Sequence, residues 1–480
     1  MSVPTRVTSA SPTLPEVLRG DYCIGCGNCA AGSLNAIRMA LDAEGFVKPL
    51  GVEPTLAAAP EIDRLCPFSD ASADEDELAA EQPWGAIPHD SQIGHWASLH
   101  AGHVSDERVR FEGGSGGITS WFLAQLLSSG EVDHVIHVKP VDPATDPEGR
   151  LFRYAISSDV DALMDGRKSR YYPVDLAGVY DLVMRTEGRF AIVAIPCFAK
   201  SIRLMQRENP QVRDRVRFVV GLVCGHLKSR SFGEYLGWLQ GVKPPRLKAI
   251  DFRVKFPGGD ASQYTVAATD GEMVRQGVPL KNYFGITWDL GFMKYNACEY
   301  CDDVMAETAD IVFGDAWISP FQDSWLGSNV VLARHPTAAR IIAAGMTNGQ
   351  LTLSPVTVDQ VITTQRSGLR HRREGLAYRL SLADRAGLWR PRKRFETIVA
   401  PIPADRAKVY ELRTRLARHT ARNFARHRTA SSVWRFQLSV SAEVFRYYMA
   451  AFGLKRALTQ SAPAKWVKQK LAARRAAKSG

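Results

Sequence analysis

The sequence of 480 residues contains no apolar run of the roughly 18 to 20 residues that a membrane-spanning helix needs. Its first 20 residues also lack the apolar segment of a secretory signal peptide, so we interpret them as a short flexible lead. Cysteine is sparse, with 8 residues, and most of these are grouped in CxxCxxC and CxxC patterns. In a cytosolic chain such patterns indicate metal binding rather than disulfides. We therefore predict a cytoplasmic protein.

Acidic residues are scarce in one part of the chain. From Pro391 to Gly480 there are 21 Lys and Arg residues against 4 Asp and Glu residues. The preceding 390 residues hold 40 basic and 46 acidic residues, so this larger part is mildly acidic. The change marks a predicted boundary between a globular body and a basic tail.

Three cysteines near the N-terminus follow the pattern CxxCxxC: Cys23, Cys26 and Cys29. A fourth, Cys66, comes 37 positions later and precedes a proline. Glycines between the first three suit a tight loop, because glycine adopts backbone conformations that other residues avoid. Four thiolates in this arrangement are typical of a 4Fe-4S cluster.

The N-terminal pattern corresponds to half of a two-cluster ferredoxin. In such ferredoxins a further cysteine follows the triple and ligates the other cluster, but Ser33 occupies that position here. A second CxxCxxC is also missing. The alternative is a zinc knuckle, although zinc sites favour paired CxxC units over a triple. We predict a one-cluster, ferredoxin-like module over residues 1–85.

Two short apolar runs in the middle of the chain are typical of strands that are buried on both faces of a parallel sheet. One run spans residues 190–195 and leads to Cys197, and the other spans residues 216–223 and leads to Cys224. Both cysteines should therefore lie at the sheet edge where ligands collect. Cys298 and Cys301 follow as a CxxC pair. These four cysteines predict a second cluster, a zinc site or a redox dithiol, and spacing alone does not choose among them.

A glycine-rich segment precedes an apolar helical pattern near residue 115. Ser115, Gly116, Gly117 and Thr119 form the turn, and a turn that opens a helix can present N–H groups to a phosphate. A glycine-rich connection without any ligand is the alternative. Asp315, which follows a glycine, is either a ligand or flavin contact or a turn or cap residue.

The central segments together resemble the beta subunit family of coenzyme F-420 (deazaflavin) hydrogenases and dehydrogenases. The resemblance rests on motifs in a specific order over residues 95–335: GGSGGITSWFLAQLLSSG, IPCFAKSIR, GLVCGHLKS, FRVK and CEYCDDVMAETADIVFGDAW. It implies a central α/β domain over residues 86–390, in an overall α+β chain. It also implies that FAD lies beside a 4Fe-4S cluster held by Cys197, Cys224, Cys298 and Cys301, which raises the number of clusters to two.

The resemblance further implies roles for particular residues. Ser115, Gly116, Gly117 and Thr119 fall on the family's turn, where flavin phosphate or ribose contacts are expected. Arg253 and Lys255 fall on its basic strand segment, where a cation meets the flavin or an anionic substrate. No catalytic residue is identified.

Two functions remain open at this point. The first is an iron-sulfur flavoprotein oxidoreductase that passes electrons between ferredoxin or a reduced deazaflavin and an organic substrate. The second is a non-catalytic, cluster-stabilised accessory protein of a polysaccharide-biosynthesis or other membrane-associated assembly.

The basic tail, residues 391–480, combines Lys and Arg at three- and four-residue steps with apolar residues between them. This pattern predicts helices that bind an anionic membrane surface or a protein partner, or that remain solvated. A peripheral position at the inner face of the membrane follows from the first of these. No nucleic-acid-binding motif accompanies the charge, so we expect no specific nucleic-acid partner.

Overall fold

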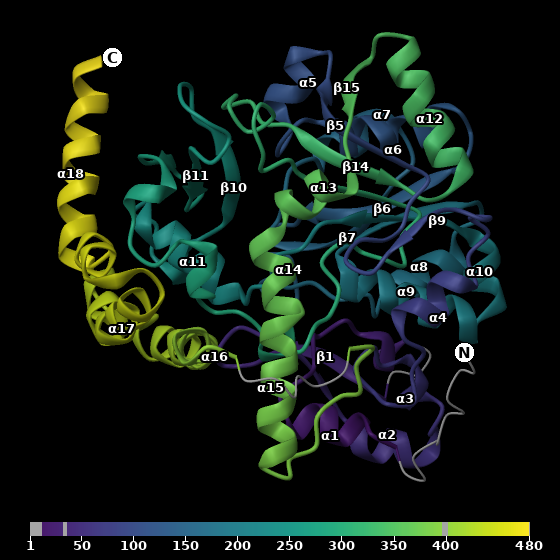
Figure 1. Cartoon of the computed structure of the whole chain (residues 1–480), viewed down its shortest axis with the longest axis horizontal. Coiled ribbons are helices and arrows are strands. Elements are labelled where there is room, and N and C mark those ends of the chain that lie inside the picture. Colours follow the sequence, from purple (N-terminus) through teal and green to yellow (C-terminus); the bar gives the residue numbers. More distant parts are fainter. Residues whose placement is uncertain (1–11, 32–35, 396–401, 480) are drawn as a thin grey trace.

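The computed structural model describes residues 12–31, 36–395 and 402–479, so Ser33 lies outside the described residues. Its largest element is a mixed sheet of eight strands in the order β15-β5-β14-β13-β9-β8-β6-β7, with helices packed around it (Figure 1). The strands are β5 (Ser98–Val104), β6 (His134–Pro140), β7 (Phe152–Ser157), β8 (Phe190–Ala194), β9 (Val216–Leu222), β13 (Ile311–Asp315), β14 (Asn329–Ala333) and β15 (Leu351–Pro355). The predicted α/β class is confirmed.

The centre of the sheet is parallel. Strands β6, β8, β9 and β13 pair in parallel, whereas β5, β7, β14 and β15 extend the sheet through antiparallel pairs. The apolar runs that predicted buried parallel strands form β8 and β9, which are neighbours. Because the two strands are parallel, the residues that follow them meet at one edge of the sheet.

Helices cover both faces of the sheet. One face carries α6 (Ile118–Ser128), α7 (Val160–Asp165) and α12 (Pro336–Thr347), and the other carries α8 (Val179–Arg185), α9 (Pro196–Glu208) and α10 (Pro210–Arg215). Side chains of β13 alternate between the faces: Phe313 packs on Phe122 of α6 with ring centroids 5.6 Å apart, while Val312 belongs to the core on the α9 side. This alternation is the period of two that strands impose.

Smaller elements flank the sheet. A three-stranded antiparallel sheet packs with α11 on one side of the body (Figure 1), and a short hairpin and α5 lie near β5. The bounds are β3 (His89–Asp90), β4 (Gly94–His95), α5 (Glu107–Glu112), α11 (Arg230–Leu239), β10 (Ala249–Lys255), β11 (Tyr264–Thr269) and β12 (Val274–Gln276). Short 3-10 helices are η1 (Asn28–Ala30), η2 (Pro244–Arg246), η3 (Leu280–Asn282), η4 (Trp288–Leu290) and η5 (Asn296–Glu299).

The N-terminal region is a small module of one hairpin and short helices beneath the body in Figure 1. Its elements are α1 (Leu14–Arg19), β1 (Arg38–Leu41), β2 (Val47–Leu50), α2 (Val52–Ala58), α3 (Ile62–Leu65) and α4 (Glu75–Ala80). Both α3 and α4 contact α9 of the body. Helix α9 begins beside Cys197, so this packing brings the module close to the cysteines of the body.

The part of the chain after β15 is helical, and its last three helices lie in the basic tail, for which the sequence predicts helices. Its helices are α13 (Val358–Thr364), α14 (Arg366–Arg372), α15 (Glu374–Arg385), α16 (Ala404–His427), α17 (Val433–Thr459) and α18 (Ala462–Ser479). The ring of Phe424 in α16 packs on Phe436 of α17 at 5.2 Å between centroids, and Phe436 packs on Tyr235 of α11 at 5.1 Å. Through these rings the basic tail packs against the main hydrophobic core. Within the described ranges, no helix is long and apolar enough to cross a membrane.

Candidate functional site

The N-terminal cysteines gather in one buried site. Gly25 and Gly27 adopt φ angles of +69° and +85°, which let the loop turn tightly enough to present its cysteines to one side. Cys66 follows α3 directly. The pKa of the Cys29 thiol is raised by burial and by the neighbouring charges of Cys26, Cys23 and Cys66. Four thiols grouped in this way are the donor set that a 4Fe-4S cluster requires.

The four cysteines of the body line one small buried cavity. Cys197 opens α9 directly after β8, and Cys224 follows β9, so both lie at the same edge of the parallel sheet. Cys298 lies in η5, and Cys301 follows it. Four thiols that line one cavity are a donor set that an iron-sulfur cluster or a zinc ion can use. Among the described residues, no group of three or more His, Cys, Asp or Glu side chains is placed to hold a single metal ion.

The two cysteine sets are neighbours. The pKa of the Cys197 thiol is raised by burial, by the other three cysteines of its own set and also by Cys26 of the N-terminal set. Ile24, between two N-terminal cysteines, lines the cavity of the body cysteines. The N–H of Leu176 donates to the carbonyl oxygen of Cys26 at 2.7 Å. The N-terminal loop is therefore fixed directly against the body site.

Asn28 links the N-terminal loop to the body through side-chain hydrogen bonds. Its side-chain amide donates to the carbonyl of Leu65 at 3.1 Å and to that of Ser201 at 2.7 Å, and its amide oxygen accepts from Tyr180 at 2.8 Å. Asn28 is fully buried. Because every one of these bonds is inaccessible to water, the loop has little freedom to move away from the body.

Arg372 is a residue that the sequence did not single out. Its side chain is 3% exposed and lines the cavity of the body cysteines. Burial alone would lower the pKa of this guanidinium, but the charges of Cys301, Cys224 and Cys298 raise it above its ordinary value. Its Nη2 donates to the carbonyl oxygen of Gly225 at 2.5 Å. Arg372 belongs to no spacing motif, so only the folded chain identifies it as the positive charge beside these thiols.

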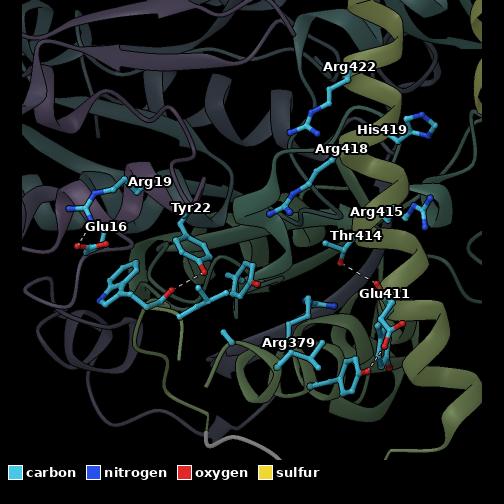
Figure 2. Close-up of a pocket in the computed structure, with 18 of the residues that line it drawn as sticks. Glu16, Arg19, Tyr22, Arg379, Glu411, Thr414, Arg415, Arg418, His419 and Arg422 are labelled. Carbon is cyan, nitrogen blue, oxygen red and sulfur yellow. Dashed lines mark hydrogen bonds and ion pairs between the residues drawn. The ribbon is translucent and has the colours of Figure 1, made fainter. Parts of the chain in front are cut away.

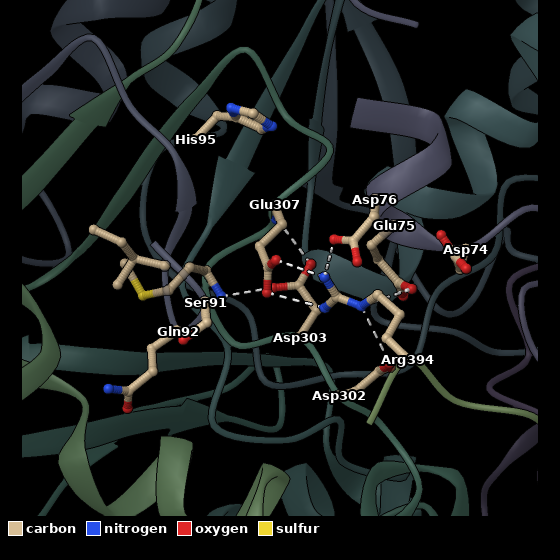
Figure 3. Close-up of polar contacts among 12 residues, drawn as sticks. Asp74, Glu75, Asp76, Ser91, Gln92, His95, Asp302, Asp303, Glu307 and Arg394 are labelled. Atoms are coloured by element: carbon tan, nitrogen blue, oxygen red, sulfur yellow. Dashed lines mark hydrogen bonds and ion pairs between the residues drawn. The ribbon is translucent and has the colours of Figure 1, made fainter. Parts of the chain in front are cut away.

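A buried ionic network surrounds the loop after Cys301 (Figure 3). Lys393 lies 3.1 Å from a carboxylate oxygen of Asp302, and Arg394 lies 2.8 Å from Glu307 and 2.7 Å from Asp76 of α4. Burial and the nearby carboxylates of Glu307 and Glu75 raise the pKa of Asp303 to about 7. The start of the basic tail is therefore fixed to both the N-terminal module and the CxxC loop. We call Lys393 and Arg394 the basic clamp.

The predicted flavin turn lies at the N-terminus of α6. Gly117 has a φ of +82°, and the helix begins at the next residue, so Thr119 lies in its first turn. A Cβ on Gly116 would lie 2.8 Å from both the carbonyl oxygen of Gly102 and Oδ1 of Asn329, so the turn is pressed against β5 and β14. The first N–H groups of a helix have no partner within it and can donate to an anion, but the N–H of Ile118 already donates to Oδ1 of Asn329 at 3.3 Å.

The other predicted flavin residues lie close to this turn. Lys255 donates to the carbonyl oxygens of Ser115 at 2.8 Å and Leu326 at 2.5 Å. Burial, together with nearby arginines, lowers the pKa of Lys255 to about 7. Arg253 forms an ion pair of 2.9 Å with Asp315. These charged groups are satisfied by one another and by carbonyl oxygens, and their contact with a flavin stays a prediction.

A chain of aromatic rings connects the predicted flavin residues to the body cysteines. Arg253 donates to the hydroxyl of Tyr171 at 3.2 Å. Tyr171 packs on Trp288 at 4.9 Å between ring centroids, and Trp288 packs on His226 at 4.5 Å. His226 follows Cys224 by two residues. The structure thus brings all the predicted site residues into one connected region, although their ligands stay predictions.

Two family models match the central part of the chain. Residues 99–180 match the model for the coenzyme F420 hydrogenase/dehydrogenase beta subunit N-terminal part, and residues 187–359 match the model for its C-terminal part. A search of curated proteins finds no match. One similar solved chain belongs to the F420-reducing [NiFe] hydrogenase complex from Methanosarcina barkeri, with 16% identity, a TM-score of 0.48, and coverage of 65% of this chain and 100% of that chain.

The family models leave both ends of the chain unmatched. Cys23, Cys26, Cys29 and Cys66 precede the matched residues, and the basic tail follows them. The four body cysteines and the predicted flavin residues all lie inside. The two models together cover more than half of the sequence, and the chain belongs to the coenzyme F420 hydrogenase/dehydrogenase beta subunit family.

Proposed function

We propose that the protein is an iron-sulfur flavoprotein oxidoreductase that passes electrons between a carrier and an organic substrate. The carrier is ferredoxin or a reduced deazaflavin, and the cofactors are two 4Fe-4S clusters and one FAD. The main support is that the two cysteine sets are neighbours: Ile24, between two N-terminal cysteines, lines the cavity of the body cysteines, and the charge of Cys26 adds to the raised pKa of Cys197. Adjacent clusters form a route for single electrons.

The residues around the cysteines suit this role. The N–H of Gly25 donates to Sγ of Cys23 at 3.3 Å, and the N–H of Leu227 donates to Sγ of Cys298 at 3.2 Å. Hydrogen bonds to sulfur and burial are among the protein's means of setting a cluster potential. The apolar side chains of Ile24 and Leu227 line the body cavity. We assign to Arg372 the role of balancing the negative charge of these thiolates.

The proposed flavin position is the turn before α6. Gly116, Gly117 and Thr119 would offer N–H groups to a phosphate, and Ser115 and Lys255 hold the turn in place. Arg253 pairs with Asp315 and donates to the hydroxyl of Tyr171. A flavin supplies the exchange between single electrons and a hydride. Tyr171 packs on Trp288, and Trp288 packs on His226, which follows Cys224 by two residues.

Cofactor analysis of protein purified without oxygen tests this proposal. We expect about eight irons, about eight sulfides and one FAD per chain, the content of two cubane clusters and one flavin. The bound flavin should then be reduced by a low-potential ferredoxin. Zinc in place of iron, or iron without flavin, would contradict the proposal and favour the accessory function.

The accessory function has one observation in its favour, which is the apolar surface of the last two helices. Residues 433–479 contain 10 Lys and Arg residues against a single acidic residue. Large apolar side chains are nevertheless exposed along α17 and α18: Leu438, Met449, Phe452, Leu454, Leu458, Trp466, Val467 and Leu471. Basic and exposed apolar residues on neighbouring helical turns are typical of helices that lie in an anionic membrane surface.

Vesicle sedimentation tests the membrane position. The variant Phe452→Ser/Leu454→Ser changes side chains that are 53% and 56% exposed, and it should sediment less than the wild type with vesicles of phosphatidylcholine and phosphatidylglycerol. A matched control is Met273→Ser/Val274→Ser, which changes exposed apolar residues outside the tail. Equal sedimentation of all three proteins, or equal binding to pure phosphatidylcholine, would remove the anionic-membrane proposal.

A further inference from the structure

A cavity of about 930 Å³ lies between the N-terminal module and the C-terminal helices (Figure 2). Its walls come from α1, from the CxxC loop, from α15 and from α16. Sites for small molecules have volumes of about 300 to 1,000 Å³, so this cavity has the size of a ligand site. Apart from Tyr300, the residues that line it lie outside the segments matched by the family models.

One side of the cavity is aromatic. Tyr22 packs edge-on against Tyr300 with ring centroids 4.6 Å apart, and against Trp389 at 5.6 Å. The hydroxyl of Tyr22 donates to the carbonyl oxygen of Trp389 at 3.1 Å, which fixes the two residues relative to each other. Rings held in this way offer a preformed apolar surface to a planar ligand.

The acidic residues of the cavity already have partners. Glu16 forms an ion pair with Arg19 at 2.6 Å, Glu411 accepts a hydrogen bond from Tyr378 at 2.7 Å, and Glu443 lies 3.2 Å from Arg415. Each of these carboxylates therefore has a partner within the cavity wall. A further arginine of the cavity wall pairs with none of these three carboxylates.

Arg418 is that further arginine. It extends from α16 into the cavity, toward the side that carries Tyr22 (Figure 2). Arg418 and Tyr22 both line the cavity. Arg418 donates to Oδ1 of Asn296 at 2.9 Å, and within the described part of the chain no carboxylate lies at ion-pair distance from it. A planar guanidinium of this kind binds phosphate and carboxylate groups well.

We propose that this cavity binds a planar aromatic molecule that carries a phosphate or carboxylate group. The ring lies against Tyr22 and Trp389, and the anionic group binds Arg418. Tyr22 and Tyr300 directly precede Cys23 and Cys301, so an occupant contacts the loops of both cysteine sets. The site is separate from the turn before α6, and it exists only because α15 and α16 fold back over the N-terminal module.

Calorimetric titration of the full-length, cofactor-loaded protein tests the proposal with three probes. These are 1-naphthyl phosphate, which has both features of the ligand, 1-naphthol, which lacks the charge, and inorganic phosphate, which lacks the ring. We expect 1-naphthyl phosphate to bind once per chain, and each of the other two probes to bind at least about tenfold more weakly, because each loses one of two contacts.

Two variants assign the binding to this cavity. Arg418→Gln should weaken 1-naphthyl phosphate binding by about tenfold, which is the loss expected for one charge-assisted contact. Arg426→Gln removes another exposed arginine of the same helix that does not line the cavity, and it should bind as the wild type does.

Three results would overturn the proposal: no binding of 1-naphthyl phosphate, equal losses in the two variants, or Arg418-dependent binding of an acidic ferredoxin without binding of the small probe. The last result would identify a protein-docking surface instead. Binding is measured without electron transfer, so a negative result leaves the proposed oxidoreductase function standing.

Discussion

At the scale of single residues, the cysteines and their charged neighbours determine the chemistry. The eight cysteines form two sets of four that share no member, and each set encloses its own buried site. Arg372 contacts one set only. Substitutions of single residues should therefore affect one site while leaving the other intact.

The variant Cys298→Ser should lose the body cluster and keep the N-terminal one. Iron content should fall from about eight to about four per chain, because one cubane loses a thiolate ligand while the other keeps all four. The reciprocal variant Cys26→Ser serves as the comparison, and it should remove the other half of the iron. Unchanged iron in Cys298→Ser would show that this cysteine is not a ligand.

The variant Arg372→Met should make the body cluster harder to reduce. Reduction adds negative charge, and removal of a buried positive charge next to the thiolates makes that addition less favourable. We expect the midpoint potential to fall by on the order of 60 mV, which corresponds to a tenfold change in a one-electron equilibrium. A redox titration followed by electron paramagnetic resonance measures it.

Arg370→Met is the control for this prediction, because Arg370 is exposed on the same helix and does not line the cavity. Equal potentials in the two variants would contradict the charge-balancing role of Arg372.

At the scale of secondary structure, the site depends on where strands end and helices begin. Cys197 and Cys224 follow neighbouring parallel strands, and the predicted flavin turn leads into α6. In the turn, Gly117 combines a positive φ with a close approach to β5, since a Cβ there would lie 2.9 Å from Cγ2 of Val104. The position of the α6 N-terminus is thus sensitive to a single methyl group.

The variant Gly117→Ala should lower both flavin retention and thermal stability. A non-glycine residue in the left-handed region costs about 1 to 2 kcal/mol, and the clash with Val104 adds to this cost. Gly130→Ala is the matched comparison, because Gly130 follows the same helix with φ +68° and has no atom within 4 Å of the added Cβ. We expect Gly130→Ala to retain flavin. Loss of flavin in both variants would show that stability alone accounts for the effect.

At the scale of the whole molecule, the basic clamp connects three parts that are distant in the sequence. Arg394 reaches Asp76 in the N-terminal module, and Glu307 and Asp302 in the body, while belonging itself to the start of the tail. Phe424 and Phe436 add a second connection, because their rings pack the tail against the main hydrophobic core. Removal of residues 391–480 would therefore uncover buried surface, so point substitutions test the tail more cleanly than truncation.

The variant Arg394→Met should destabilise the whole chain and loosen the N-terminal module. Breaking a buried ionic network costs about 3 to 5 kcal/mol, because the remaining carboxylates lose their partner without returning to water. A lowered unfolding midpoint and faster loss of N-terminal cluster iron to a chelator would measure this change. The neighbouring variant Arg392→Met changes an exposed side chain and should behave as the wild type. Identical chelation rates would show that the clamp does not hold the module.

The sequence alone determined the features that depend on neighbours along the chain. Cysteine spacing, the glycines at positions 25 and 27, the buried runs that form β8 and β9, and the helical tail all arise from local geometry and hydrophobic pattern. Only the tertiary structure decided the proximity of the two cysteine sets, the place of Arg372 beside the body cysteines, and the cavity between Tyr22 and Arg418. These features join residues separated by more than 70 positions, and their contacts form only when the module, the sheet and the tail pack together.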